Sequence, residues 1–249
     1  MIRFEDPTTL SLLFHLNSEP WLNDDAYRGT AYHQEFKEIE APEGRLALPA
    51  APASALMHTL RRRRSCRAYD PRARLPLASL SALVLAAYGI VRVAPLEGVS
   101  SFLRRTVPSA GGLFPLELFL FTQRVQDVAD GLYHYDVRAH GLTAVRTGEL
   151  FSSLEPALYA FPFVRDANVL FAFAAMFSRT QRKYGPRGYR YILLEAGHAA
   201  QNLTIAATEC GLGSLCIGGF VDSALNRAIG LEPSAEGVVY AIAAGIPQE

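Results

Sequence analysis

The chain contains little cysteine, which restricts the kinds of site it can hold. Only Cys66, Cys210 and Cys216 are present among its 249 residues, and no two of them have Cys-x-x-Cys spacing. An odd count without that spacing argues against a disulfide framework and against a structural zinc site. We therefore expect buried thiols and no metal.

The chain also lacks an excess of charge of either sign. It has 24 Lys plus Arg and 24 Asp plus Glu, so no overall field favours nucleic acid or an anionic membrane. Its longest apolar stretches, at 167–177 and 191–211, are too short or too polar to span a bilayer. The first 20 residues do not resemble a secretory signal. We expect a cytoplasmic protein that binds neither nucleic acid nor membrane.

Against this neutral background, one short stretch is strongly basic. Residues 61–70 read RRRRSCRAYD, with five arginines around one serine. Arg63, Arg64 and Arg67 can give charge-assisted hydrogen bonds to phosphate oxygens, and Ser65 adds a small hydroxyl donor. The stretch therefore predicts an anion site, most readily for a phosphate. The alternative is a solvated basic surface, which is what a run of like charges often is.

The apolar pattern predicts an α+β fold. Residues 1–53 read as an irregular N-terminal arm that ends in a linker rich in Ala and Pro, and residues 54–249 as the compact domain. Helices come first, and strands and helices mixed with a hairpin follow, an order that indicates an α+β layer fold. The hairpin indicates antiparallel pairing. Helices are expected from Ser54 into the arginines, from Pro76 to Gly89, and over 191–211 and 222–229; strands over 116–123, 131–146 as a hairpin, 167–177 and 237–245.

Three glycine-containing stretches are ambiguous when each is taken alone. The stretch 210–214, CGLGS, follows a helix and precedes a strand, the reverse of a dinucleotide-binding loop. The stretches 108–112, PSAGG, and 217–220, IGGF, have small residues that would let the backbone approach a flat ligand. Each is an ordinary turn more often than a site.

Taken in order, these stretches resemble a known family, the FMN-dependent nitroreductase superfamily, and within it the SagB-type azoline dehydrogenases, or thiazole/oxazole oxidases. The resemblance covers roughly residues 54–247. It rests on RRSCRAYD at 63–70, PSAGGLFPLELFL at 108–120, KYGPRGYRYILLEAGHAAQNL at 183–203, GLGSLCIGGFVD at 211–222 and the closing VVYAIAAGIP.

The resemblance implies a nitroreductase-like sandwich in which helices flank a central, mainly antiparallel sheet. It further implies an entwined homodimer with FMN at the subunit interface. Pro108, Ser109, Ala110 and Gly111 would form the loop that the partner chain lays against the flavin. The other cofactor contacts would be Arg63, Arg64, Ser65 and Arg67 at the phosphate and ribityl chain, and Gly218 and Gly219 near flavin N5.

Lys183 and Tyr184 match the Lys-Tyr pair that azoline-oxidising members use in catalysis. Turning an azoline into an azole removes two ring hydrogens, one as a proton to a base and one as a hydride to the flavin. The alternative is a solvated lysine beside a half-buried tyrosine. Glu195 and His198, three residues apart on one expected helix, are too few ligands for a metal and are better read as buried, hydrogen-bonded residues.

The expected activity is therefore FMN-dependent oxidation of thiazoline or oxazoline rings in a peptide that is either ribosomal or bound to a carrier protein. A cyclodehydratase or synthetase would be a partner, and oxygen would reoxidise the flavin. Three alternatives remain: an NAD(P)H-dependent nitro or quinone reductase, another FMN-dependent desaturation of a peptide, and a flavin-free relic that serves as a scaffold.

Overall fold

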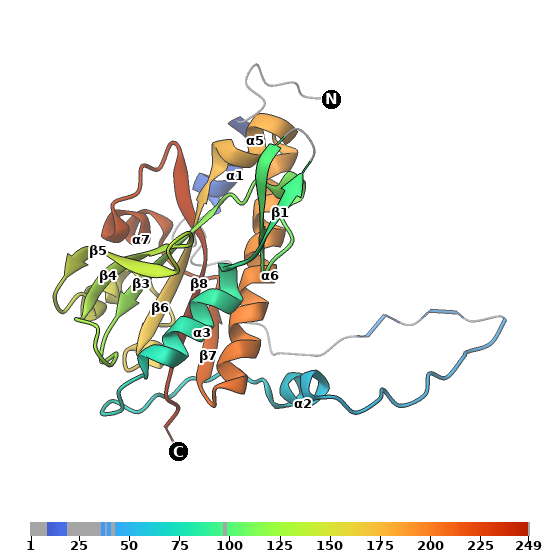
Figure 1. The fold of residues 1–249 in the computed structure, drawn as a ribbon, viewed down its shortest axis with the longest axis horizontal. Coiled ribbons are helices and arrows are strands. Elements are labelled where there is room, and N and C mark those ends of the chain that lie inside the picture. Colours follow the sequence, from blue (N-terminus) through green and yellow to red (C-terminus); the bar gives the residue numbers. More distant parts are fainter. Residues whose placement is uncertain (1–8, 19–35, 38, 41–42, 97–98, 249) are drawn as a thin grey trace.

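The computed structural model describes residues 9–18, 36–37, 39–40, 43–96 and 99–248. Its centre is a six-stranded sheet with the order β5-β4-β3-β6-β8-β7, in which every neighbouring pair is antiparallel. Helices cover both faces (Figure 1). This confirms the α+β class with a mainly antiparallel sheet. The strands are β3 (Leu116–Thr122), β4 (Gly131–Asp136), β5 (Gly141–Thr147), β6 (Val169–Met176), β7 (Gly213–Ile217) and β8 (Glu236–Gly245).

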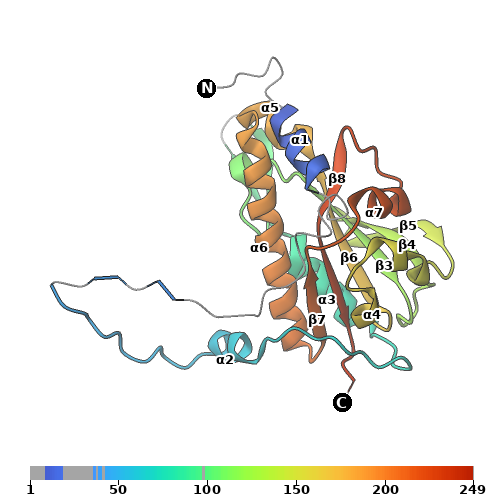
Figure 2. The same ribbon diagram turned by 180° about the vertical axis from the view of Figure 1, so that it is seen from behind.

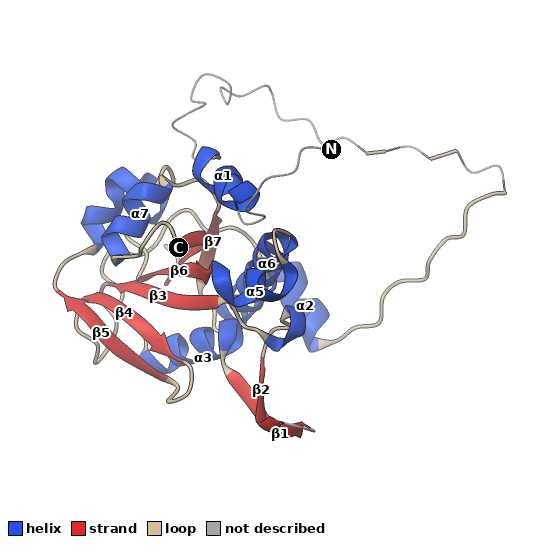
Figure 3. Cartoon of the chain, turned by 90° about the horizontal axis from the view of Figure 1, so that it is seen from above, coloured by secondary structure: helices blue, strands red, loops and turns tan. Residues whose placement is uncertain are grey.

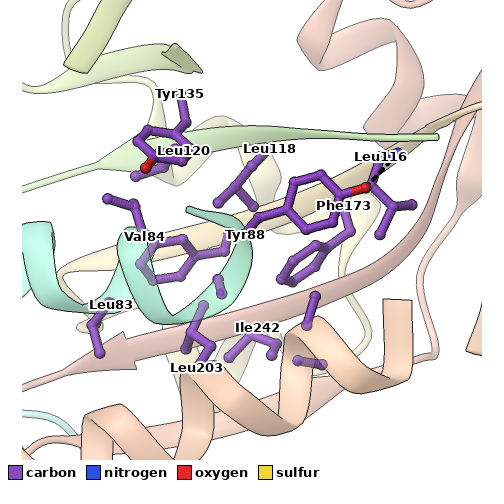
Figure 4. Packing of buried hydrophobic residues seen from close by; sticks show 14 of the residues in the cluster. Leu83, Val84, Tyr88, Leu116, Leu118, Leu120, Tyr135, Phe173, Leu203 and Ile242 are labelled. Atoms are coloured by element: carbon purple, nitrogen blue, oxygen red, sulfur yellow. Dashed lines mark hydrogen bonds between the residues drawn. The ribbon is translucent and has the colours of Figure 1, made fainter. Parts of the chain in front are cut away.

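The sheet separates two apolar cores. Strand β6 is buried along almost its whole length, because its odd-numbered residues face one core and its even-numbered residues the other. Such two-sided burial explains its continuous apolar sequence. One core lies under α3 (Leu77–Tyr88) and α6 (Arg187–Glu209), and Figure 4 shows Tyr88, Phe173 and Leu203 among its side chains. The other lies under η3 (Phe151–Ala157), α4 (Phe161–Val164) and α7 (Asp222–Ile229).

The long helix α6 positions much of the rest. Its buried side is rich in alanine, including Ala196, Ala199 and Ala200, which lets it pack closely on α3. Helix α5 (Phe177–Tyr184) lies at its N-terminal end, and α2 (Ala55–Arg62) lies at its C-terminal end, where Thr59 Oγ1 donates a 2.6 Å hydrogen bond to Glu209 (Figures 1 and 2).

Most expected elements are confirmed, with small changes at their ends. Ser54 caps α2 by accepting a hydrogen bond from the Met57 amide, and α3 ends at Tyr88, just before Gly89. The hairpin is β4 and β5, and the strands at 116, 167 and 237 are β3, β6 and β8. Helix α6 begins at Arg187, four residues before the expected start.

Several elements were not expected. Strands β1 (Ile90–Leu96) and β2 (Val99–Arg105) form a separate hairpin that projects from the body (Figure 3). Helix α5 was missed altogether. The N-terminal arm was expected to be irregular, but α1 (Thr9–Asn17) is a helix there, and it packs on α5 and α6 through Ser11 and His15.

None of the helices in the described ranges has both the length and the apolar content that crossing a bilayer requires. Residues 43–54 run without regular structure and with every side chain exposed. They lead into α2 from outside the body of the protein (Figure 3).

Candidate active site

Residues 61–70, here called the arginine segment, lie along the edge of the sheet at the C-terminal end of α6. The Cys66 amide donates to the Ser214 carbonyl at 2.8 Å, and Ser65 forms a parallel bridge with Ser214 of β7. Farther along, the Gln248 amide donates to the Ala68 carbonyl. The segment is thus held by backbone hydrogen bonds, which leaves its arginine side chains available.

Glycine is required at position 213 for this arrangement. A Cβ atom there would overlap the side chain of Cys66. The CGLGS stretch, read from the sequence as a turn, therefore does form the turn between α6 and β7, and it also lets the arginine segment pack against β7. The thiol of Cys66 is partly buried and donates to the Ala68 carbonyl at 3.1 Å.

A cavity of about 600 Å³ opens at this segment. Within the described residues, no ion pair or hydrogen bond occupies the guanidinium group of Arg62, Arg64 or Arg67. Unpaired guanidinium groups around a cavity form a suitable anion site. Arg63 is the C-cap of α2 and does not line this cavity, whereas Arg62, which the sequence analysis did not select, does. The remaining wall is Ser65, Cys66, Ala68, Thr208, Gly211, Leu212, Gly213, Pro247 and Gln248.

Gly218 and Gly219 follow β7 directly. Strand β7 starts at Gly213 beside the arginine segment, so these glycines lie roughly 17 Å farther along at about 3.3 Å per residue. Both are exposed, and a Cβ atom at Gly218 would meet nothing within 4 Å. The chain therefore presents open backbone on the same sheet edge as the arginines.

The second group of expected site residues lies at the other end of α6. There the loop of Pro108 and Ser109 leads into a single 3₁₀ turn, η2 (Ala110–Gly112). A Cβ atom at Gly111 would lie 2.9 Å from Lys183 Nζ and 2.8 Å from Tyr184 Oη. Gly111 also has φ +64°, a conformation that side chains disfavour. The loop and the Lys-Tyr pair of one chain thus meet at Gly111.

The Lys-Tyr pair is itself ordered by aromatic contacts. Lys183 Nζ lies over the ring of Tyr184, 5.3 Å from its centroid, and the ring of Tyr191 packs edge-on against Tyr184 at 5.1 Å. Because α5 ends at Tyr184 and Gly185 turns the chain into α6, the amine and the hydroxyl both project from the corner between the two helices.

A buried carboxylate holds the loop in place. Glu195 of α6 accepts hydrogen bonds from Ser109 and from the Tyr88 hydroxyl, and Ser109 Oγ accepts from the Phe114 amide at 2.9 Å. Burial raises the pKa of the Glu195 carboxyl, although these hydrogen bonds oppose the rise. This confirms Glu195 as a buried, hydrogen-bonded residue, while His198 is exposed in the single chain.

Arg105 and Arg179, which sequence reasoning missed, support the same loop. The guanidinium of Arg105 lies between the rings of Tyr88 and Phe114, at 4.4 and 4.5 Å from their centroids. Arg179 of α5 pairs with Glu117 at 2.5 Å and donates to the Phe114 carbonyl. No signal in the sequence links these residues, because their contacts join segments far apart along the chain.

The two groups of site residues are far apart within one chain. The arginine cavity includes Thr208 near the C-terminus of α6, whereas Lys183 and Tyr184 lie at its N-terminus. A 23-residue helix is about 34 Å long. Figures 1 and 2 show α5 and α2 at opposite ends of α6.

Comparison with known proteins identifies the family. Residues 60–246 match the Nitroreductase family. The chain belongs to the nitroreductase family. It is 34% identical over 182 residues to the protein MJ1384 of Methanocaldococcus jannaschii, across 73% of this chain and 87% of that protein. Membership makes this nitroreductase-family chain an oxidoreductase by class.

Two further relatives of this nitroreductase-family chain are a microcin B17-processing and a trifolitoxin-processing protein. The Microcin B17-processing protein McbC of Escherichia coli is 31% identical over 52% of this chain and 49% of its own length. The Trifolitoxin-processing protein TfxB of Rhizobium leguminosarum bv. trifolii is 30% identical over 56% of this chain and 39% of its own length. These matches support the SagB-type assignment, although they span less than half of either relative.

Solved structures share the fold. The E. coli microcin synthetase McbBCD complex, with truncated pro-MccB17 bound, contains a chain that matches with a TM-score of 0.70 and 22% identity, over 98% of this chain and 94% of that one. A protein from Desulfovibrio desulfuricans solved with FMN matches with a TM-score of 0.52 and 18% identity, over 80% of this chain and 89% of that one. The expected nitroreductase-like fold is confirmed.

Proposed function

We propose that the protein is an FMN-dependent dehydrogenase that oxidises thiazoline or oxazoline rings in a peptide natural product. The observation that carries this proposal is the meeting of Lys183 Nζ and Tyr184 Oη at Gly111. An amine and a phenol that lie side by side against a glycine can act together as a proton acceptor. The peptide-processing relatives McbC and TfxB support the choice of a peptide as substrate.

The residues at the arginine cavity suit FMN. Unpaired Arg62, Arg64 and Arg67 would hold the phosphate, with Ser65 as a further donor, and the cavity of about 600 Å³ leaves room for the group. Gly218 and Gly219, with their open backbone, would hold the ring system on the same sheet edge. The Desulfovibrio desulfuricans protein of the same fold was solved with FMN, which agrees with this assignment.

We also propose that the active site forms between two copies of the chain. About 34 Å of helix separates the arginine cavity from the Lys-Tyr pair, so one chain does not bring both to one flavin. Among the residues described, helix α6 has an exposed side that does not line a groove, formed by Leu194, which is 54% exposed, with Gly197, His198 and Gln201. A homodimer would cover this side and place the Gly111 loop and Lys-Tyr pair of one subunit near the arginine segment of its partner.

In this proposal each residue has a defined part in aromatisation. Lys183 Nζ takes the proton from the ring carbon, and the Tyr184 hydroxyl hydrogen-bonds the ring or shares that proton. Gly111 leaves room for both groups, and Glu195 fixes the loop through Ser109. When bound, FMN supplies the acceptor for the hydride, and oxygen is its final oxidant.

The test is an anaerobic titration that records the flavin spectrum while a short thiazoline peptide or NADPH is added. We expect bleaching by the thiazoline peptide and little by NADPH. A K183M variant should keep its FMN and lose bleaching by the peptide, whereas R138Q, at the exposed turn between β4 and β5, should behave as wild type. Rapid bleaching by NADPH alone would favour a nitro or quinone reductase, and a colourless purified protein would favour a flavin-free scaffold.

A further inference from the structure

The corner between α5 and α6 carries a local excess of positive charge. Residues 177–194 read FSRTQRKYGPRGYRYILL and contain five basic residues and no Asp or Glu, although the whole chain has no net charge. Arg179 is neutralised by Glu117. Arg182, Arg187 and Arg190 are exposed, and in the described part of the chain none of their side chains forms an ion pair or a hydrogen bond. We call these three residues the basic corner.

An apolar groove of about 450 Å³ runs beside the basic corner. Arg187 and Arg190 line it together with hydrophobic side chains from α1 and α6. Phe14 is 60% exposed and Leu193 is 38% exposed, so both present apolar surface to a ligand. The other residues that line the groove are Ser11, Pro186 and Tyr189.

The groove adjoins the catalytic pair. The ring of Tyr184 packs on that of Tyr191 at 5.1 Å, and Arg187 lies about one helical turn, roughly 6 Å, before Tyr191. An extended peptide advances about 3.3 Å per residue. A peptide whose ring lies at Lys183 therefore reaches the groove with residues about two to four positions from that ring.

We propose that this groove binds the segment of the peptide substrate that flanks the reacting ring, and that it selects segments carrying Asp or Glu beside an apolar side chain. Charge complementarity identifies this occupant, because unpaired guanidinium groups favour carboxylates in bidentate geometry. The apolar side chain would cover Phe14 and Leu193. The identity of the ligand as the substrate peptide rests on the function proposed above, but its binding can be measured without turnover.

The test is fluorescence anisotropy with the FMN-loaded protein and two fluorescein-labelled ten-residue peptides that contain no azoline. One carries Asp-Leu-Glu at its centre, and the other carries the isosteric Asn-Leu-Gln. We expect the acidic peptide to bind about tenfold more tightly at low salt, as two exposed ion pairs allow. The R187E/R190E variant should lose this preference, and R138E, with a single reversed charge far from the groove, should keep it.

Equal affinity for the two peptides, binding of neither, or an unchanged preference in R187E/R190E would overturn the proposal. If the reversed charges prevent folding, as judged by flavin content and circular dichroism, R187Q/R190Q gives the same reading. Because neither peptide has an azoline ring, this result is independent of the anaerobic titration. A preference for the acidic peptide without bleaching by a thiazoline would place the fault in the proposed reaction and leave the groove assignment standing.

Discussion

The hydroxyl of Tyr88 donates a hydrogen bond to the buried carboxylate of Glu195, with Oη and Oε1 2.5 Å apart. The same hydroxyl accepts a hydrogen bond from the Leu116 amide at 3.2 Å. Tyr88 thereby joins the end of α3, the start of β3 and the middle of α6. Glu195, held by Tyr88, in turn accepts a hydrogen bond from Ser109 and so fixes the position of the loop. The position of the Gly111 loop depends on a contact between residues 107 positions apart.

Replacing Tyr88 with Phe should destabilise the protein markedly. Both Glu195 and the Leu116 amide would lose a partner in a buried setting, and each such loss costs about 1–3 kcal/mol. Y133F is the matched control, because the hydroxyl of that buried tyrosine makes a single 2.8 Å hydrogen bond, to the Ala129 carbonyl. Urea unfolding should show a larger loss for Y88F, and equal losses would contradict the role assigned to Tyr88.

Replacing Glu195 with Gln should change how stability depends on pH. The pKa of Glu195 is raised by burial, so above the ordinary carboxyl pKa of about 4.3 the folded state binds more protons than the unfolded state. This contribution to stability is therefore present at low pH and is lost as pH rises through the folded pKa. Wild type should lose stability relative to E195Q over that window, as denaturant titrations at several pH values would show. A constant difference between the two proteins would rule out the raised pKa.

Replacing Gly111 with Ala should abolish activity while FMN remains bound. The new Cβ atom would lie within 3 Å of Lys183 Nζ and Tyr184 Oη, so both groups must move. G230A is the matched control, since Gly230 at the end of α7 is also left-handed, with φ +92° and ψ 32°, but has nothing within 4 Å of a Cβ atom. Both variants pay a backbone cost of about 1 kcal/mol. Only G111A should lose thiazoline-dependent flavin reduction. Similar rates of flavin reduction in the two variants would show that Lys183 and Tyr184 do not act at Gly111.

Replacing Arg64 and Arg67 with Gln should weaken FMN binding through its phosphate. A hydrogen bond to a charged group contributes about 1.5–3 kcal/mol, so at least about a tenfold loss is expected for each arginine. Riboflavin, which has no phosphate, provides the control ligand within the same experiment. Fluorescence titration of apoprotein should show weaker binding of FMN and unchanged binding of riboflavin. A parallel loss for both ligands would show that the arginines act on the fold and not on the phosphate.

The sequence predicted elements whose apolar pattern is long or uninterrupted. Strand β6 and helix α6 were recognisable because buried surface dictates their composition along their length. Helix α5 was missed because it is short and polar, and only Phe177 and Thr180 are buried. Its structure depends on packing against α6. The hairpin of β1 and β2 was missed because it projects from the body and lacks the alternation that a half-buried strand shows.

The candidate site divides in the same way. The arginine segment and the Lys-Tyr pair are visible in local sequence, but their separation along α6 appears only in the fold. The support that Glu195 gives to the loop could likewise not be predicted, because Tyr88 and Ser109 contact it only in the folded chain. Local motifs were therefore enough to propose the reactive groups, while the residues that hold them in place could be found only from the fold.

Helix α6 also restricts how the protein can change in length. Each residue of a helix adds about 1.5 Å and 100° of rotation, so one insertion inside Arg187–Glu209 would turn the arginine segment relative to the Lys-Tyr corner. In the homodimer proposed above, that change would affect both flavin sites. Insertions should be tolerated in segment 43–54, which has no regular structure, whereas α6 should tolerate none.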